Sequence, residues 1–108
     1  MFIAVALGAF GAHGLKSSID AEHLATWNTA VHYHALHALA LVAFGIWRER
    51  TPGSNFPGFA FQAGIVIFSG SLYALALGGP TWLGPVTPFG GMALLSGWLS
   101  LGILSLRR

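Results

Sequence analysis

The segment from Thr51 to Leu106 contains fifty-six consecutive residues without Asp, Glu, Lys or Arg. About 25% of the residues of an average soluble domain are charged, so a segment of this length should carry roughly fourteen charges. The whole chain has 108 residues, of which 55% are hydrophobic and 7% are charged. A soluble domain of this size leaves much of its surface in water and cannot bury so much apolar area. We therefore predict an all-α integral membrane protein whose main partner is the lipid bilayer.

Four apolar stretches predict a single bundle of four transmembrane helices over residues 1–108, with helices at about 1–14, 24–47, 58–79 and 87–106. Pro80 stops the third helix. The fourth is expected to begin with Thr87 as the N-cap and Pro88 at the first helical position. The first stretch is shorter than the 17 to 25 residues, roughly, that a span requires. Because no positive n-region precedes it, a first helix whose beginning is missing is favoured over a signal peptide.

The distribution of Lys and Arg predicts an orientation. The loop after the second helix and the C-terminus share four arginines, Arg48, Arg50, Arg107 and Arg108. The opposite side has Lys16 alone, offset by Asp20 and Glu22. The excess of positive charge places both termini in the cytoplasm. The expected location is the cell (inner) membrane, or a mitochondrial membrane if the protein is eukaryotic. A net charge of +2 is too small for a nucleic-acid partner.

Tryptophans and small residues predict how the helices sit and pack. Trp27 and Trp47 are separated by about 30 Å of helix, the thickness of the hydrocarbon core, and are expected to be interfacial anchors. Helices in lipid associate through small residues that allow close approach. The expected packing positions recur every four residues on the first and third helices and continue on the fourth: Gly8, Ala12, Gly70, Ala74, Gly78 and Gly97.

Several polar side chains fall within the predicted spans, where an ionisable group is a functional candidate. His37 is the sharpest case because it lies midway between Trp27 and Trp47. His34 and Tyr33 share faces of the helix with it. The candidate polar site comprises His13, His34, His37, Tyr33, Ser69, Ser71 and Tyr73. The favoured interpretation is neutral imidazoles hydrogen-bonded to Ser69, Ser71, Tyr73 or backbone carbonyls. A haem or metal at His13 and His37, a proton or solute path, and catalysis remain alternatives.

Enzyme chemistry has little support in the residues, and no cofactor is predicted. The only carboxylates, Asp20, Glu22 and Glu49, are expected in loops, so the bundle lacks a paired acid and base. The chain has no cysteine, which excludes thiolate metal sites and cysteine nucleophiles. Trp98 falls near the middle of its helix and is expected to be a buried packing residue whose indole N–H seeks a partner.

Five segments, in order, resemble the DUF 423 family, a domain of unknown function that also covers the eukaryotic transmembrane protein 256. They are G-A-F-G-A-H-G at Gly8 to Gly14, W-N-T-A-V-H-Y-H-A-L-H-A-L-A-L at Trp27 to Leu41, F-S-G-S-L-Y at Phe68 to Tyr73, T-P-F-G-G at Thr87 to Gly91, and G-W at Gly97 and Trp98. The resemblance implies a small multi-pass bacterial membrane protein with cytoplasmic ends and a first helix that normally begins roughly ten residues earlier. His13 and His37 match motif positions of the family, whereas the position of His34 also accepts Gln, a poor metal ligand.

The resemblance brings no activity, because the family is named for lacking one. The minimal loops and small-residue faces favour an accessory or scaffold component that packs against itself or against other membrane-protein subunits. The alternative is a His-lined intramembrane site for a cofactor, metal, proton or small solute.

Overall fold

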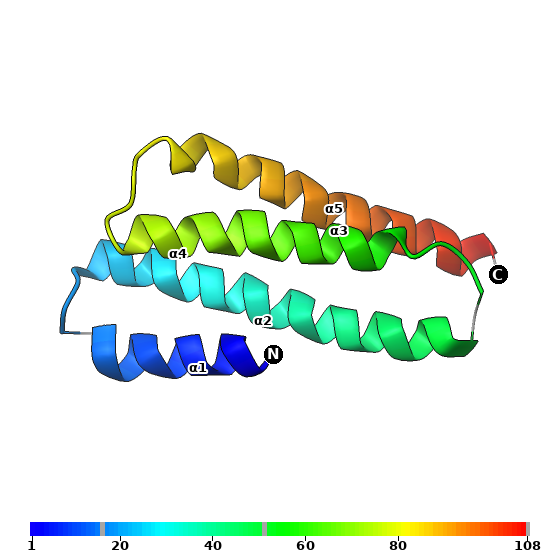
Figure 1. Cartoon of the computed structure of the whole chain (residues 1–108), viewed down its shortest axis with the longest axis horizontal. Helices are drawn as coiled ribbons and strands as arrows, with labels where there is room; N and C mark the ends of the chain where they lie inside the picture. Colours follow the sequence, from blue (N-terminus) through cyan, green and yellow to red (C-terminus); the bar gives the residue numbers. More distant parts are fainter. Residues whose placement is uncertain (16, 51, 108) are drawn as a thin grey trace.

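The structure, a computed structural model, describes residues 1–15, 17–50 and 52–107, with the backbone alone described for Arg107. Four helical segments alternate in direction along the chain (Figure 1). The first joins α1 (Phe2–Phe10) to a π-helical turn, η1 (Gly11–Leu15), and the second is α2 (Ala21–Arg50). The third joins α3 (Phe56–Gly64), the π-helical η2 (Ile65–Ser69) and α4 (Gly70–Ala76). The fourth is α5 (Leu83–Arg107). The described residues form no strand, as the all-α prediction requires.

Three of these segments are long and apolar enough to cross a membrane: residues 21–50, 56–76 and 83–106. The first, Phe2–Leu15, is apolar but shorter. The prediction of four helices with a short first one is therefore confirmed. The charge count behind the predicted orientation rests partly on Lys16 and Arg108, which lie outside the described residues.

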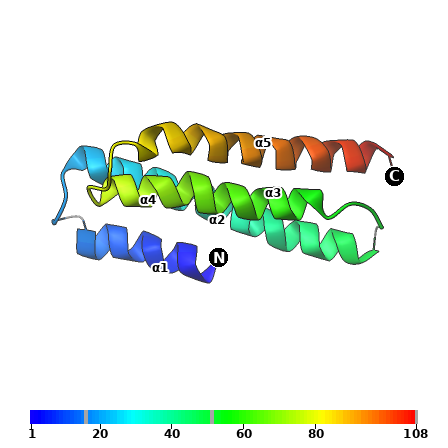
Figure 2. The same cartoon turned by 45° about the horizontal axis from the view of Figure 1, so that its top comes forward.

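The helices pack in the order in which they occur in the chain. The element pairs whose backbones approach closely are α1 with α2, α2 with the third segment, and the third segment with α5. In Figure 2 the third segment lies between α5 and α1, with α2 passing behind it. The result is a flattened array with principal extents of 49 × 27 × 15 Å.

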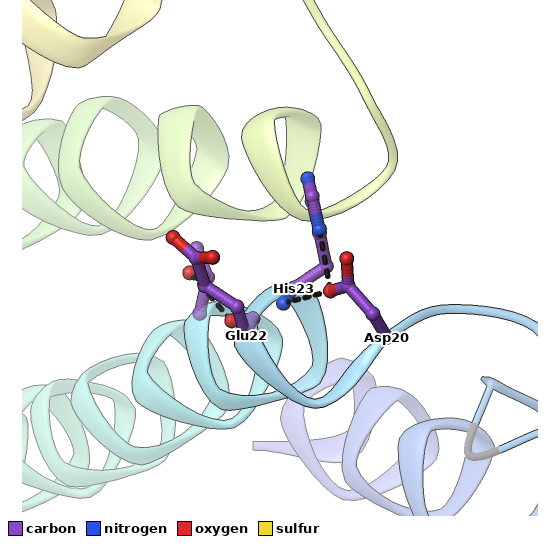
Figure 3. Close-up of polar contacts among 4 residues, drawn as sticks. Asp20, Glu22 and His23 are labelled. Carbon is purple, nitrogen blue, oxygen red and sulfur yellow. Dashed lines mark hydrogen bonds and ion pairs between the residues drawn. The ribbon is translucent and has the colours of Figure 1, made fainter.

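A capping carboxylate fixes the start of α2. The Asp20 Oδ1 atom accepts a hydrogen bond from the backbone N–H of His23 at 2.8 Å (Figure 3). This is the N-cap arrangement, in which a side-chain oxygen satisfies a backbone donor of the first turn. The same oxygen lies 2.7 Å from His23 Nδ1. These bonds lower the pKa of Asp20, the backbone bond contributing most. The helix thus begins three residues before the predicted position 24.

A left-handed glycine terminates the third segment. Gly78 has φ of 87°, and the N–H groups of Gly78 and Gly79 donate to the carbonyls of Leu75 and Ala74 at 3.1 and 2.8 Å. These two bonds form a Schellman motif, which satisfies carbonyls at the end of the helix. Gly78 therefore forms the turn that ends the helix. It was expected at a helix crossing, but no atom lies within 4 Å of the position of an added Cβ, so that expectation is wrong.

The fourth helix begins at Leu83, four residues before the predicted start. Pro85 then lies in the first turn, where its missing N–H costs nothing, and Pro88 lies inside the helix. Thr87 is a helical residue rather than the expected N-cap, and its hydroxyl donates to the carbonyl of Leu83 at 3.3 Å. Both prolines are compatible with the first turn of a helix, and in the structure it is Pro85 that lies there.

Candidate functional site: a histidine and tryptophan bridge between helices

His37 is a buried histidine, 3% exposed, whose two ring nitrogens both make hydrogen bonds. Its Nδ1 atom lies 2.8 Å from the carbonyl oxygen of Tyr33, one turn earlier in α2. Its Nε2 atom lies 2.9 Å from the indole Nε1 of Trp98 in α5. A carbonyl only accepts and an indole N–H only donates, so Nδ1 donates and Nε2 accepts. The geometry therefore requires neutral His37 with its proton on Nδ1.

Aromatic rings surround this bridge. Phe61, which is 0% exposed, comes from α3, and its ring centre lies 5.7 Å from that of His37 and 4.9 Å from that of Trp98. Gly97 makes room for it, because a Cβ there would lie 2.7 Å from Phe61 Cε1. Trp98 finds the hydrogen-bond partner expected from its sequence position, but its side chain is 43% exposed rather than buried.

A cavity of about 370 Å³ opens beside the bridge. Its walls combine Tyr33 and His37 of α2 with Phe68 of the third segment and residues of α5, including Trp98. Because both His37 nitrogens are already bonded, the polar character of this cavity comes mainly from the Tyr33 side chain, which is 39% exposed.

The other candidate residues on α2 and the third segment form separate contacts. His34 Nδ1 lies 2.9 Å from the hydroxyl of Tyr73, which links α2 to α4. The Ser69 hydroxyl donates to the carbonyl of Ala30 at 3.0 Å. The Ser71 hydroxyl lies 2.6 Å from that of Thr87 and donates to the Phe68 carbonyl. Of the three hydroxyl residues expected to partner histidines, only Tyr73 does so.

His13 does not join His37, so the structure does not bring together the two histidines on which the alternative site was centred. His13 is exposed in η1, next to Gly11, which packs against Trp27. His37 follows Trp27 by about 15 Å along the axis of α2. Within the described part of the chain, no three His, Cys, Asp or Glu side chains gather as metal ligands do. In the described structure, both ring nitrogens of His37 are engaged, so this side chain offers no free nitrogen to a haem or metal.

Trp27 also departs from its expected role. Its side chain is 3% exposed, and its indole N–H donates to the carbonyl of Leu7 in α1 at 2.9 Å. It packs against Tyr73 at 4.7 Å between ring centres and against Phe10 at 5.9 Å. Trp27 is thus a core residue that fastens α1 to α2, not an interfacial anchor. Trp47 is half-buried near the end of α2, where it remains a predicted anchor.

The small residues expected at helix crossings divide into two groups. Gly8 lies against Val31 of α2, and Gly97 lies against Phe61. Ala74 is half-buried in α4, whereas Ala12 is exposed. Gly70 faces open space. The four-residue spacing missed several close approaches between helices, among them those of Gly11, Gly58, Gly64 and Gly90. Gly11 and Gly90 lie inside the quoted G-A-F-G-A-H-G and T-P-F-G-G segments, the one signal that pointed to them.

Comparison with known proteins identifies the family. The model of the family described as "Protein of unknown function (DUF423)" matches residues 7–91. A UPF0382 membrane protein of Staphylococcus saprophyticus is 45% identical over 94% of this chain and 85% of its own length. The UPF0382 membrane protein YwdK of Bacillus subtilis is 40% identical over 97% of this chain and 88% of its own length.

The UPF0382 inner membrane protein YgdD of Escherichia coli is 39% identical over 99% of this chain and 85% of its own length. No solved structure matches the chain. The matched residues include His34, His37 and Tyr73, so the contact of His34 with Tyr73 lies within the region that defines the match, whereas Trp98, the partner of His37, lies beyond it. The chain is a membrane protein and belongs to the DUF423 family.

Proposed function

We propose that this protein is a small accessory or scaffold component that packs within a membrane complex or homo-oligomer. The observation that carries the proposal is the low burial of the helices. In this thin array, each long helix has only a small part of its surface covered by neighbouring helices. In the most hydrophobic windows of the three long helices, 22%, 33% and 17% of residues are buried. The polar side chains in the described interior are satisfied within the chain, with no buried donor or acceptor unpaired. What the protein offers outward is therefore mostly apolar surface.

The outer side of α5 is one such surface. Five large apolar side chains, each more than 45% exposed, follow one another along it: Phe89, Met92, Leu95, Leu99 and Ile103. Helices in membranes associate by packing such surfaces closely against each other. A partner helix along α5 would also enclose the exposed part of Trp98.

Photocrosslinking in native membranes tests the proposal. A photoreactive amino acid at Leu95 should give a discrete adduct with a protein, either a second copy or another subunit. The matched control is the same label at Ser54, an exposed position in the loop before α3. Crosslinks to lipid alone at Leu95, together with a monomer on blue-native gels, would contradict the scaffold role.

We further propose that both termini face the cytoplasm and that the protein is not an enzyme. The orientation is supported by Arg48 and Arg50 at the end of α2, which lies at the same end of the array as the end of α5 (Figure 1). The absence of catalysis is supported by the positions of the carboxylates. Asp20 and Glu22 lie at the start of α2 and Glu49 at its end, far along the helix from His37. A cysteine introduced at Ser105 should be labelled only by reagents that cross the membrane.

The alternative function is passage or binding of a small solute beside His37. The cavity of about 370 Å³ next to the bridge favours it. A His37→Leu change in proteoliposomes tests this alternative, which predicts a loss of solute or proton flux. If the His37→Leu variant shows the same flux as the unaltered protein, the solute-passage function is excluded.

A further inference from the structure

A second cleft, of about 400 Å³, lies where the end of α2 meets the start of α3. We propose that it holds one anionic glycerophospholipid taken from the surrounding bilayer. The cleft combines three features that such a lipid requires: a cationic group at its mouth, an amide at the depth of the glycerol esters, and an apolar wall for an acyl chain. This site is distinct from the histidine bridge and does not depend on the scaffold role.

Arg48 provides the cationic group at the mouth. Its Nε atom donates to Asn55 Oδ1 at 2.9 Å, and its Nη2 atom donates to the carbonyl of Gly53. These bonds hold the guanidinium in place beside the cleft. A guanidinium has five N–H donors and is well suited to phosphate oxygens.

The charge of this end of the molecule favours an anionic headgroup. At the end of α2, the described side chains include Arg48 and Arg50 against Glu49 alone. Glu49 also lines the cleft and would repel a phosphate placed on its side, so the headgroup is expected on the side of Asn55. Basic pockets between membrane helices bind anionic lipid headgroups for the same electrostatic reason.

Gln62 provides the polar group deeper in the cleft. It lies about 10 Å further along the third span than Asn55, measured at the usual rise per residue. Its side chain is exposed, and in the described residues 1–15, 17–50 and 52–106 it makes no hydrogen bond. An unpaired amide at membrane depth is costly. A lipid ester carbonyl would accept a hydrogen bond from it and remove that cost.

Two glycines and three apolar side chains shape the remainder. Leu41, Phe44 and Phe59 line the walls, and the last of these is 66% exposed. Gly45 leaves the cleft open, because no atom lies within 4 Å of the position of an added Cβ. Gly58 packs against Phe44, whose ring lies 3.1 Å from the position of its added Cβ. An acyl chain fits this surface by contact with methylene and aromatic groups.

Native mass spectrometry of the full chain in detergent tests the site with two lipids that share oleoyl chains, phosphatidylglycerol and phosphatidylcholine. Phosphatidylglycerol should bind about fivefold more tightly, the effect of one arginine near the headgroup. Gly45→Leu should fill the cleft and weaken this binding at least tenfold or so, because the leucine occupies the place of the acyl chain. Gly102→Leu, at another glycine with open space around its Cβ position, is the matched control and should bind as the unaltered protein does.

Gln62→Leu is a second variant that leaves the buried packing untouched. It should weaken the binding of both lipids equally, because both carry the same glycerol esters. Circular dichroism and elution volume verify that each variant is folded. Unchanged phosphatidylglycerol binding in folded Gly45→Leu, or equal binding of the two lipids, would overturn the proposal. A dimer that dissociates in Gly45→Leu would show that a second copy fills the cleft instead of a lipid.

Discussion

The contact of α5 with the third segment and the contact of α1 with α2 both place glycines at their centres, but these glycines face different atoms. A Cβ added at Gly90 would lie 2.3 Å from the backbone nitrogen of Phe68. One added at Gly64 would lie 2.3 Å from a side-chain carbon of Leu94 and 3.1 Å from its backbone nitrogen. In the first segment, the nearest atoms are side-chain atoms: Val31 Cγ1 lies 3.2 Å from the Cβ position of Gly8 in α1, and Trp27 Cδ1 lies 2.6 Å from that of Gly11 in η1.

The difference shows which contact can adapt. Main-chain atoms within a helix cannot move aside without moving the helix, whereas a side chain can change rotamer at smaller cost. The third and fourth spans are therefore fixed at a backbone-to-backbone distance. The first helix instead rests on side chains that can adjust, and Trp27 contributes most because it also donates to the Leu7 carbonyl.

The largest effect is expected from Gly90→Ala. The new methyl group would overlap the backbone at Phe68 and force α5 away from the third segment, with a loss of about 3 kcal/mol or more of unfolding free energy. Unfolding by SDS titration in mixed micelles measures this loss. Gly102→Ala, in the same helix with open space around it, is the control and should be neutral or slightly stabilising. Equal stabilities of the two variants would contradict a rigid contact.

A smaller loss is expected from Gly11→Ala. Trp27 can rotate away from the new methyl group but would lose its hydrogen bond to Leu7, and we expect a cost of about 1 to 2 kcal/mol. The same titration, followed by tryptophan fluorescence, measures both the stability and the changed surroundings of the indole. If Gly11→Ala costs as much as Gly90→Ala, the distinction between the two contacts does not hold.

The bridge between α2 and α5 depends on one hydrogen bond between side chains, so its removal should cost less again. Trp98→Phe keeps an aromatic ring but removes the donor to His37, with an expected loss of about 0.6 kcal/mol, the average for such bonds in membranes. Trp82→Phe, at a tryptophan that is 64% exposed, is the control. Nitrogen NMR should find the His37 proton on Nδ1 in the unaltered protein. A proton on Nε2 would be incompatible with the bridge.

The smallest effect concerns the connection between α1 and α2. The bonds from His23 lower the pKa of Asp20, so the carboxylate form is favoured by the fold. This contribution is present above the ordinary pKa of an aspartate and is lost as the pH falls through the lowered value, below about pH 4. Asp20→Asn keeps the cap but removes the charge, and should flatten the acid limb of melting temperature against pH. An unchanged acid limb would show that Asp20 does not contribute to it.

The predictable part of this fold was what each residue expresses alone. The uncharged run requires no knowledge of neighbours, and the membrane class follows from it. Pro80 was expected to stop the third helix, but the helix ends earlier, at Ala76, before the left-handed Gly78. That the indole N–H of Trp98 finds a hydrogen-bond partner was also predictable, because tryptophans in the middle of a helix commonly do so. The partner itself, His37, depends on how α2 and α5 are brought together over α3.

The packing contacts depend on how two helices meet, so they could not be predicted from the sequence of one helix. Trp27 and Trp47 have the spacing of two anchors, but α1 covers the first of them. The four-residue spacing of small residues identified Gly70 and missed Gly64, although both lie in the third segment. Spacing places residues on a common face but does not say which face a neighbour meets. The start of α5 was also not fixed by local sequence, because Pro85 and Pro88 are each compatible with the first turn of a helix.

Packing in chain order has a consequence for biogenesis. Each helix after the first finds the neighbour it needs among segments made earlier, so contacts can form during synthesis in the order in which helices leave the ribosome. No helix must wait for a distant part of the chain before it can associate, and such local topology favours fast folding. The first contact to form, between α1 and α2, is the one whose side chains can adjust. The last, between α5 and the third segment, is the one held at a fixed backbone distance.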